Sequence, residues 1–488
     1  MAQRKRIGER LLEAGLINQE QLEMGLREQK KTGELLGSIL FGLGFVSQKD
    51  LFHLLSISYE GSLDSLPREE ETSGGPEIES LIRQSTVSFQ AEGPQTRKGI
   101  ESAHSPIVRL VDKIIMGGID QQATDVHIGP DVKGVRARYR VDGRLKQGMF
   151  APRDLLNAIV SRIKIIGNMN IAETRIPQDG SSEFIYKAKK FDLRISTFPV
   201  MGGENVVVRI LDKSQLKLGL ERLGFSFSDT ERINEILKTP YGMVLVTGPT
   251  GSGKTTTLYS CLSLLNTVNK HIFTIEDPVE YQMPLIRQSQ VNTKAGLTFA
   301  TGLRSILRQD PDIILVGEMR DVETAELAVR AALTGHLVFS TLHTNDAVTC
   351  IMRLMDMGID PFLVSGTLDT VIAQRLVRLL CTECREELAA GDPLYQTLHS
   401  DPAVLKMFRA KGCSLCGETG YKGRTVIYEI LKISPALRDM INQRMNVDAI
   451  KQQALKEGFR TMFDLGLEKV KAGFTTLVEV RSVARAAE

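Results

Sequence analysis

Tryptophan is absent from the 488 residues, and aromatic side chains account for only 6% of them. Stacking platforms for nucleic-acid bases depend on such side chains, so the sequence does not indicate one. The chain also has no excess of charge, because 61 Lys and Arg stand against 59 Asp and Glu, giving a net charge of +2. Nucleic-acid-binding proteins are usually strongly basic, and we therefore expect no nucleic acid among the partners.

Long apolar runs are missing as well. No run approaches the ~20 residues that a membrane-spanning helix needs. Residues 1–10 are charged and lack the apolar stretch of a secretory signal. The six cysteines are then expected to be reduced thiols or metal ligands. These features predict a soluble, cytoplasmic protein, and its length suggests about three domains.

The first sixty residues contain an internal repeat. The positions Gly8, Leu11, Gly15, Leu22 and Leu26 recur 29 residues later as Gly37, Leu40, Gly44, Leu51 and Leu55. Leucines four positions apart lie on one face of a helix, so each unit predicts a helix, a glycine-ended turn and a second helix. We predict an N-terminal helical module over residues 1–60. Residues 61–104 are polar and predict a flexible linker, with one short helix near residues 78–84.

The rest of the chain has an α/β pattern. Residues 105–215 predict a small mixed domain, in which strands at 135–139 and 144–150 flank the hairpin signal Asp142-Gly143. From residue 220, four strands alternate with helical patterns. These strands are expected at 243–247, 272–275, 313–316 and 337–340. Such alternation predicts a parallel sheet with helices on both faces, and an α/β multidomain fold overall.

The segment GPTGSGKT at residues 248–255 follows one of these strands and opens a helix. That context is typical of a phosphate-binding loop and disfavours a glycine-rich turn formed by chance. Backbone N–H groups of such a loop surround phosphate oxygens, and the helix N-terminus adds positive potential. We expect Lys254 to reach the β- and γ-phosphates of ATP, and Thr255 to ligate Mg²⁺. The predicted nucleotide-binding residues are Gly248, Pro249, Thr250, Gly251, Ser252, Gly253, Lys254, Thr255 and Thr256.

Acidic residues follow two further predicted strands. Glu318 comes after the strand at 313–316 and could hold Mg²⁺ through water or polarise the attacking water. Glu276 comes after the strand at 272–275. Ligands of open α/β sheets lie outside the carboxyl ends of the strands, so both acids should approach Lys254. A surface acid and a helix cap remain the alternatives, and the sequence does not divide the base and Mg²⁺ roles between the two residues.

A histidine follows the fourth of these strands. His343 could sense the γ-phosphate through a hydrogen bond, whereas His336, before the strand, is expected to be structural.

Two cysteine pairs, Cys381-x-x-Cys384 and Cys413-x-x-Cys416, are separated by 29 positions. Two thiolates three residues apart fit one edge of a Zn²⁺ tetrahedron, and the second pair completes it. A redox pair is the alternative, but nothing around these cysteines resembles a thioredoxin context. The spacing therefore predicts a zinc-binding insert over residues 381–416.

The nucleotide-binding segments, in this order, resemble those of the secretion ATPases that drive type II secretion and type IV pilus assembly. The similarity includes ATDVHIGP (123–130), RIPQDG (175–180), DLRIST (192–197), ENVVVRIL (204–211), IAQRLVRLLC (372–381) and TGYKGRTVIYEI (419–430). It implies a RecA-like ATPase domain over residues 220–488, preceded by a PAS-like small domain.

The resemblance also implies a function. It points to a homohexamer with ATP between subunits, which drives pseudopilus assembly and protein export, or alternatively pilus extension, through inner-membrane partners. Arg194 and Arg209 of the small domain would then reach the phosphates as the domains close. The planar, permanently charged guanidinium suits that role, although both arginines could instead be solvated strand residues.

The N-terminal repeat resembles the MshEN-like helical module, which binds cyclic di-GMP in some of these motors. The residues that match are Arg6, Gly8, Leu11, Gly15, Leu22, Leu26, Gln29 and Gly37. Where the repeat would place a second arginine, the chain has Leu35. A docking module for a membrane partner is the alternative.

Overall fold

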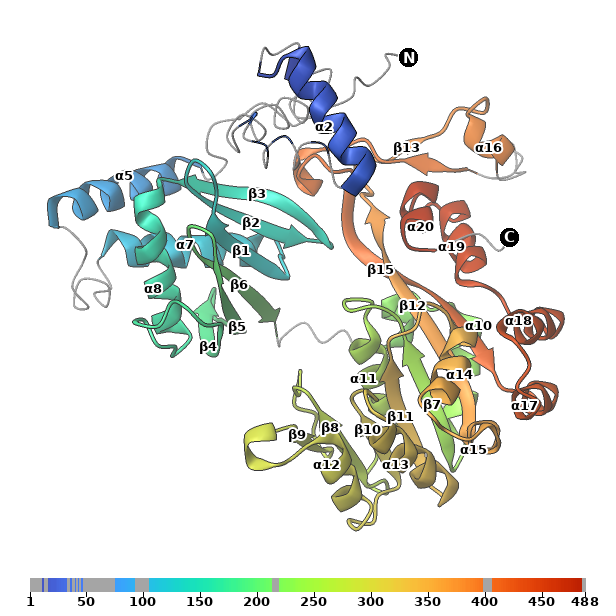
Figure 1. Ribbon diagram of the computed structural model, residues 1–488. Coiled ribbons are helices and arrows are strands. Elements are labelled where there is room, and N and C mark those ends of the chain that lie inside the picture. The colour runs from blue at the N-terminus through green and yellow to red at the C-terminus, as the bar shows by residue number, and fades with distance from the viewer. Residues whose placement is uncertain are drawn as a thin grey trace. The chain divides into compact units, whose positions relative to one another are not determined.

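The computed structural model describes residues 11–12, 16–32, 36, 40, 43, 45–46, 75–92, 105–212, 219–397 and 406–484. The chain divides into two units, residues 1–80 and residues 81–488. Figure 1 labels the helices and strands. Among the described residues, no helix combines the length and the apolar character that crossing a bilayer requires.

The N-terminal repeat is also a repeat in structure. Leu11 and Leu40, one period apart, are both fully buried in the same small core. The backbone N–H of Leu16 donates to the carbonyl of Leu11 at 3.0 Å, and that of Phe45 donates to the carbonyl of Leu40 at the same distance. Each unit therefore closes the same turn, and both turns pack into one core.

The proposed cyclic di-GMP residues have different environments in this unit. Leu11 and Leu22 belong to its core, whereas Leu26 on helix α2 (Gln19–Thr32) is 41% exposed. Gln29 lies on the same helix. Arg6, Gly8, Gly15 and Gly37 lie outside the described residues.

Helix α5 (Gly75–Glu92) lies within the predicted linker. It spans 18 residues, and therefore extends well beyond the short helix that the sequence suggested near residues 78–84. Leu81 and Ile82 are buried on it. The remainder of the segment 61–104 lies outside the described residues.

A six-stranded antiparallel sheet follows, in the order β3-β2-β1-β6-β5-β4. Its strands are β1 (Asp125–Pro130), β2 (Val135–Val141), β3 (Arg144–Ala151), β4 (Gln178–Tyr186), β5 (Lys189–Val200) and β6 (Gly203–Asp212). Helices α7 (Pro106–Asp120) and α8 (Leu156–Ile166) pack on it through buried apolar side chains. The predicted hairpin is confirmed, because Asp142 and Gly143 have φ of 48° and 83°, as a two-residue turn requires.

The large sheet has seven strands in the order β15-β12-β7-β11-β10-β8-β9. Its strands are β7 (Gly242–Thr247), β8 (Ile272–Glu276), β9 (Arg287–Gln290), β10 (Ile313–Val316), β11 (Leu337–Leu342), β12 (Leu368–Leu380) and β15 (Tyr421–Lys432). Every neighbouring pair is parallel except β12 with β15. The predicted parallel sheet is therefore confirmed, with an antiparallel strand at one edge.

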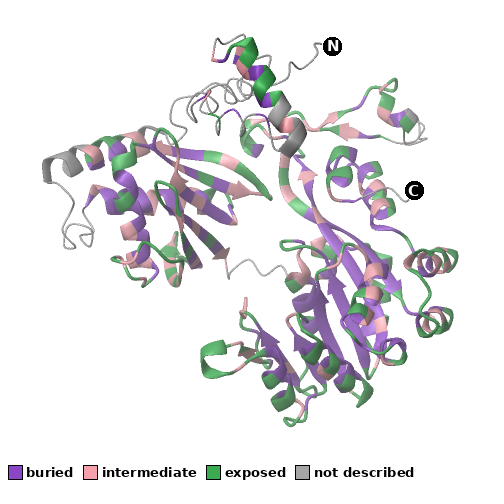
Figure 2. Cartoon of the chain, viewed as in Figure 1, coloured by how far each residue is buried: buried purple, intermediate pink, exposed green. Residues whose placement is uncertain are grey.

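Successive residues of β7 alternate between two apolar cores. Met243 and Leu245 belong to one core, and Val244 and Val246 belong to the other. Because side chains alternate across a strand, the two cores lie on opposite faces of the sheet. The central strands β7, β10 and β11 are buried throughout as a result (Figure 2).

Helices before and between the strands supply these cores. They are α9 (Leu220–Leu223), α10 (Phe227–Leu237), α11 (Lys254–Leu265), α12 (Phe299–Ile306), α13 (Val322–Leu333), α14 (Ala347–Asp356) and α15 (Pro361–Thr367). Four more follow the last strand: α17 (Pro435–Asn442), α18 (Val447–Lys456), α19 (Met462–Lys471) and α20 (Leu477–Val483).

An excursion joins β12 to β15. It contains a two-stranded antiparallel ribbon, β13 (Glu386–Glu387) with β14 (Phe408–Arg409), and the short helix α16 (Pro393–Thr397). The two cysteine pairs bracket this ribbon in the sequence.

The small sheet contains a buried ion pair that generates a prediction. Lys164 on α8 is 1% exposed, and its Nζ lies 2.7 Å from a carboxylate oxygen of Glu204 on β6. Lys164→Ala leaves that carboxylate buried without a cation, so we expect a loss of about 3–5 kcal/mol in unfolding free energy. Scanning calorimetry of the full chain measures it. Lys190→Ala, which removes the exposed pair with Glu183 on the same sheet, is the control and should leave the unfolding midpoint unchanged.

Candidate active site

The phosphate loop connects β7 to α11 and depends on its glycines. Gly248, Gly251 and Gly253 have φ of 146°, 78° and 88°, a region that favours residues without a Cβ. At Gly248, a Cβ would lie 2.5 Å from the carbonyl oxygen of Gln374. The loop therefore keeps this path only with glycine at position 248, and the predicted strand, loop and helix are all present.

Gln374 on β12 holds this loop and was not among the site residues predicted from the sequence. Its buried amide donates to the carbonyl of Ser252 at 2.8 Å and accepts from the hydroxyl of Thr257 at 2.9 Å. The side chain thus joins the loop to the first turn of α11. A glutamine in the strand segment VIAQRLV, which is apolar apart from Gln374 and Arg375, was the signal that could have identified it, since buried polar side chains need partners.

Lys254 rests on its own loop. Its Nζ donates to the carbonyls of Gly248 at 2.8 Å and Pro249 at 3.2 Å. Burial lowers the pKa of Lys254, the nearby Glu318 raises it, and Arg375 lowers it further. Among the described residues, no carboxylate lies within ion-pair distance of this ammonium group. The loop therefore presents a half-buried cation whose hydrogen-bond partners among the described residues are neutral carbonyls.

These features fit a bound nucleotide phosphate. The hydroxyl of Ser252 is buried and, in the part of the chain that is described, has no hydrogen-bond partner. The glycines leave open backbone at the start of α11, and Thr255 is exposed there. Loop N–H groups, the helix N-terminus and Lys254 together form an anion-binding site.

The order of the strands decides which predicted residues approach the loop. The phosphate loop follows β7, and the segment containing His343 follows its neighbour β11. Glu318 follows β10, the next strand, and Glu276 ends β8, one strand farther. Neighbouring strands are about 4.8 Å apart, so β10 lies about 10 Å from β7 and β8 about 14 Å away. All four segments lie at the same edge of the sheet, and their distance from the phosphate loop increases from the His343 segment to Glu318 and then to Glu276.

Glu318 and His343 are in contact. The Nε2 of His343 lies 3.2 Å from Oε2 of Glu318, whose Oε1 lies 2.5 Å from Nη2 of Arg320. The side chain of Glu318 is only 15% exposed, and its charge acts on Lys254. These two predicted residues are therefore brought together beside the phosphate loop.

Glu276 has a different environment. It is 3% exposed and accepts hydrogen bonds from Tyr259 of α11, from the hydroxyl of Thr274 at 2.5 Å, and from the amide of Gln288 at 3.3 Å. Burial raises the pKa of the Glu276 carboxyl, and these three donors oppose that rise. In this structure Glu276 is the acceptor of a buried hydrogen-bond network that includes the phosphate-loop helix.

The two predicted arginines are neighbours across β5 and β6. The guanidinium of Arg194 pairs with Glu280 at 2.9 Å. The Nε of Arg209 donates to Oδ1 of Asp125 at 3.0 Å, and its side chain is half exposed.

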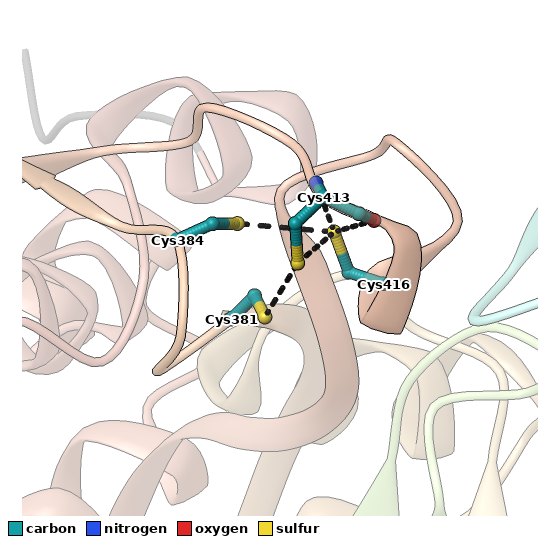
Figure 3. A group of neighbouring side chains, drawn as sticks. All are labelled: Cys381, Cys384, Cys413 and Cys416. Atoms are coloured by element: carbon teal, nitrogen blue, oxygen red, sulfur yellow. Dashed lines mark hydrogen bonds between the residues drawn. The ribbon is translucent and has the colours of Figure 1, made fainter.

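The four cysteines converge at the base of the excursion. Figure 3 shows the four side chains pointing toward one another. The sulfur atoms of Cys381 and Cys413 are 3.9 Å apart, those of Cys384 and Cys416 are 3.8 Å apart, and all four lie within 4.8 Å of one another. A tetrahedron with metal–sulfur bonds of 2.3 Å has edges of about 3.8 Å, whereas a disulfide needs about 2.05 Å. The spacing suits a tetrahedral thiolate site and suggests zinc.

Comparisons with known proteins agree with this geometry. The profile of the type II/IV secretion system protein family matches residues 101–482. The chain belongs to this family. Type II secretion system protein E of Pseudomonas aeruginosa is 46% identical over 80% of this chain and 78% of its own length. The type IV pilus assembly ATPase PilB of Myxococcus xanthus is 43% identical over 83% of this chain and 73% of its own length.

A solved structure supports the fold of this secretion-family chain. The pilus retraction motor PilT with bound ADP superposes with a TM-score of 0.54 and 28% identity. The match covers 77% of this chain and 97% of that protein. The resemblance to secretion and pilus-assembly ATPases that the sequence indicated is therefore confirmed.

The two glutamates generate a prediction that separates their environments. We expect Glu318→Gln and Glu276→Gln each to lower ATP turnover by at least about 10²-fold, as loss of a charge-stabilising or proton-accepting group does. Only Glu276→Gln should also lower the unfolding midpoint. The NH2 group of the new amide would face the three groups that donate hydrogen bonds to the carboxylate of Glu276. Steady-state ATPase assays and thermal unfolding measure both effects. Equal loss of stability in the two variants would contradict the conclusion that Glu276, unlike Glu318, belongs to a buried hydrogen-bond network.

Proposed function

We propose that this chain is a motor ATPase that hydrolyses ATP to power pseudopilus assembly and protein export in type II secretion. The observation that carries the proposal is the phosphate loop, which opens α11 beside the strand ends that bear Glu318 and His343. The relative at 46% identity is a type II secretion system protein E, which favours secretion as the process.

The residues of the loop have distinct roles in this proposal. Bound ATP and Mg²⁺ supply the phosphoanhydride bond and a Lewis acid that neutralises phosphate charge. Lys254 turns from the carbonyls of Gly248 and Pro249 to phosphate oxygens. Thr255, exposed at the start of α11, provides a hydroxyl for the metal ion.

Glu318 is better placed than Glu276 to act on the attacking water. It is the nearer acid by strand order, and it contacts His343, which lies after the strand next to β7. Glu276 instead accepts a hydrogen bond from Tyr259 and so stabilises α11. His343, half exposed, is free to follow the γ-phosphate with Glu318 as its partner.

The proposal includes a homohexamer with ATP between subunits, in which Arg194 and Arg209 of the small sheet reach phosphate oxygens when the domains close. The motor would work in the cytoplasm, at the inner membrane, where it passes its motion to a membrane platform of the secretion machine. The small sheet and the large sheet would be the PAS-like and RecA-like domains of this motor.

Pilus assembly is the second candidate process. A PilB of Myxococcus xanthus is 43% identical to this chain, close to the value for the secretion protein. Regulation by cyclic di-GMP through residues 1–60 would accompany either process. The repeated turn at Leu11 and Leu40 is consistent with a module of two similar halves.

Zinc is the metal that we propose for the cysteine cluster. Four thiolates leave no position open for water or substrate, so the site would be structural. It would fasten the excursion between β12 and β15, and its binding energy would be coupled to local folding.

Lys254→Ala tests the ATPase assignment. It removes a phosphate contact at the surface of a loop, so we expect ATP hydrolysis to fall to background while the fold and the assembly state persist. A malachite-green phosphate assay and analytical ultracentrifugation measure these. Lys270→Ala, a partly exposed lysine paired with Asp312, is the control. Unchanged ATP turnover in the Lys254 variant would contradict the proposal that the chain is a motor ATPase.

Cys413→Ser tests the zinc site. Protein purified without a metal-affinity tag should contain one zinc per chain, and the variant should lose it and become protease-sensitive in the excursion, with the phosphate loop intact. Elemental analysis and limited proteolysis are the measurements. The neighbouring Ser414→Ala removes no thiolate and should retain zinc. Less than stoichiometric zinc in the unmodified protein, with full activity of Cys413→Ser, would show that the cluster is not structural.

A further inference from the structure

Among the described residues, Arg209 is held through one nitrogen, its Nε. Its Nε donates to Oδ1 of Asp125 at 3.0 Å, while its side chain is 53% exposed. Within the described residues, the two terminal nitrogens have no hydrogen-bond partner. The guanidinium is therefore fixed at its base and exposed at its end.

Asp125 is itself fixed. It begins β1, opposite Arg209 on β6 in the register of the sheet, and its side chain is 10% exposed. The hydroxyl of Thr124 donates to its Oδ2 at 2.8 Å. On the other side, Nε of Arg140 on β2 lies 3.9 Å from the same oxygen. This carboxylate therefore cannot swing away from Arg209 without losing a hydrogen bond.

We propose that Asp125 is a positioning residue, which aims the two terminal nitrogens of Arg209 at phosphate oxygens of the nucleotide. This inference rests on the proposed function, because it assigns to Arg209 the phosphate contact described there. The chemical class of the ligand is a nucleoside triphosphate, bound by a neighbouring copy of this chain.

The physical argument concerns the freedom of the arginine side chain. Arginine has several rotatable bonds, and ordering them opposes any contact that the side chain makes. A carboxylate that holds Nε restricts this freedom before phosphate arrives, yet leaves the fork of terminal N–H groups for two oxygens. A contact made mainly in the closed, reacting state raises kcat more than it lowers KM.

The same sheet contains a matched control. Asp131 accepts a hydrogen bond from Nε of Arg136 at 2.5 Å, and that pair lies at the other end of the β1–β2 hairpin. Asp131→Asn removes the same kind of contact from an arginine that has no proposed ligand. This control variant distinguishes a loss of Arg209 orientation from a general loss of stability in the small sheet.

The experiment measures ATP hydrolysis by the full chain at varied ATP concentration. We expect Asp125→Asn to lower kcat by about 10-fold or more with KM changed by less than about 2-fold, as loss of a charge-assisted contact in the transition state does. Asp131→Asn should keep both values. In the Arg209→Ala background, Asp125→Asn should cause no further loss, because the residue that it positions is gone.

Additive losses in the double variant, or a normal kcat in Asp125→Asn while Arg209→Ala is impaired, would overturn the inference and leave the ATPase standing. A normal kcat in Arg209→Ala overturns it too. Failure of the proposed function appears separately, as unchanged hydrolysis in Lys254→Ala.

Arg209→Lys covers the case in which Asp125→Asn does not fold. An ammonium group keeps the charge, but it cannot bind Asp125 through Nε and also offer two fixed donors. We expect a loss of kcat near that of Arg209→Ala, with the unfolding midpoint kept. Full activity of Arg209→Lys would overturn the inference by itself.

Discussion

The site depends on one constraint, which is that six neighbouring strands of the large sheet run parallel, with both faces covered at the central strands. The central strands β7, β10 and β11 are buried and mostly apolar, so their polar chemistry gathers at the edge where their carboxyl ends meet. β7 has neighbours on both sides. The phosphate loop can therefore be supported by β12 through Gln374 and can meet His343 from β11.

Buried polar side chains turn this edge into a connected unit. Gln374 joins β12 to Ser252 and Thr257, and the hydroxyl of Thr247 at the end of β7 lies 2.8 Å from that of Thr344 after β11. Because each of these groups would be costly to bury alone, they fix the relative positions of the segments that they connect. The residue that precedes the phosphate loop is thereby hydrogen-bonded to the segment that contains His343.

Local features of the sequence were predictable, and long-range pairings were not. The strand boundaries, the hairpin at Asp142 and the phosphate loop follow from residues close together in the chain, since turn chemistry and alternation are local. The order of the strands is not local. It places Glu276 three strands from β7 and within a buried network, although the sequence grouped it with Glu318. The contact of Arg209 with Asp125, 84 residues away, likewise required the register of β1 and β6.

Lys254 and Arg209 solve the same physical problem in two ways. In the proposed function, each must stay charged and oriented before an anion arrives, yet must not be fully neutralised by the protein. Lys254 is held by two neutral carbonyls, which it can exchange for phosphate oxygens without leaving a buried charge behind. An arginine can keep a carboxylate partner throughout, because Nε and the terminal nitrogens point in different directions. The lysine is therefore suited to a loop that would exchange its contacts when phosphate binds. The arginine is suited to a position on a strand, where the carboxylate of Asp125 would set the direction of its approach.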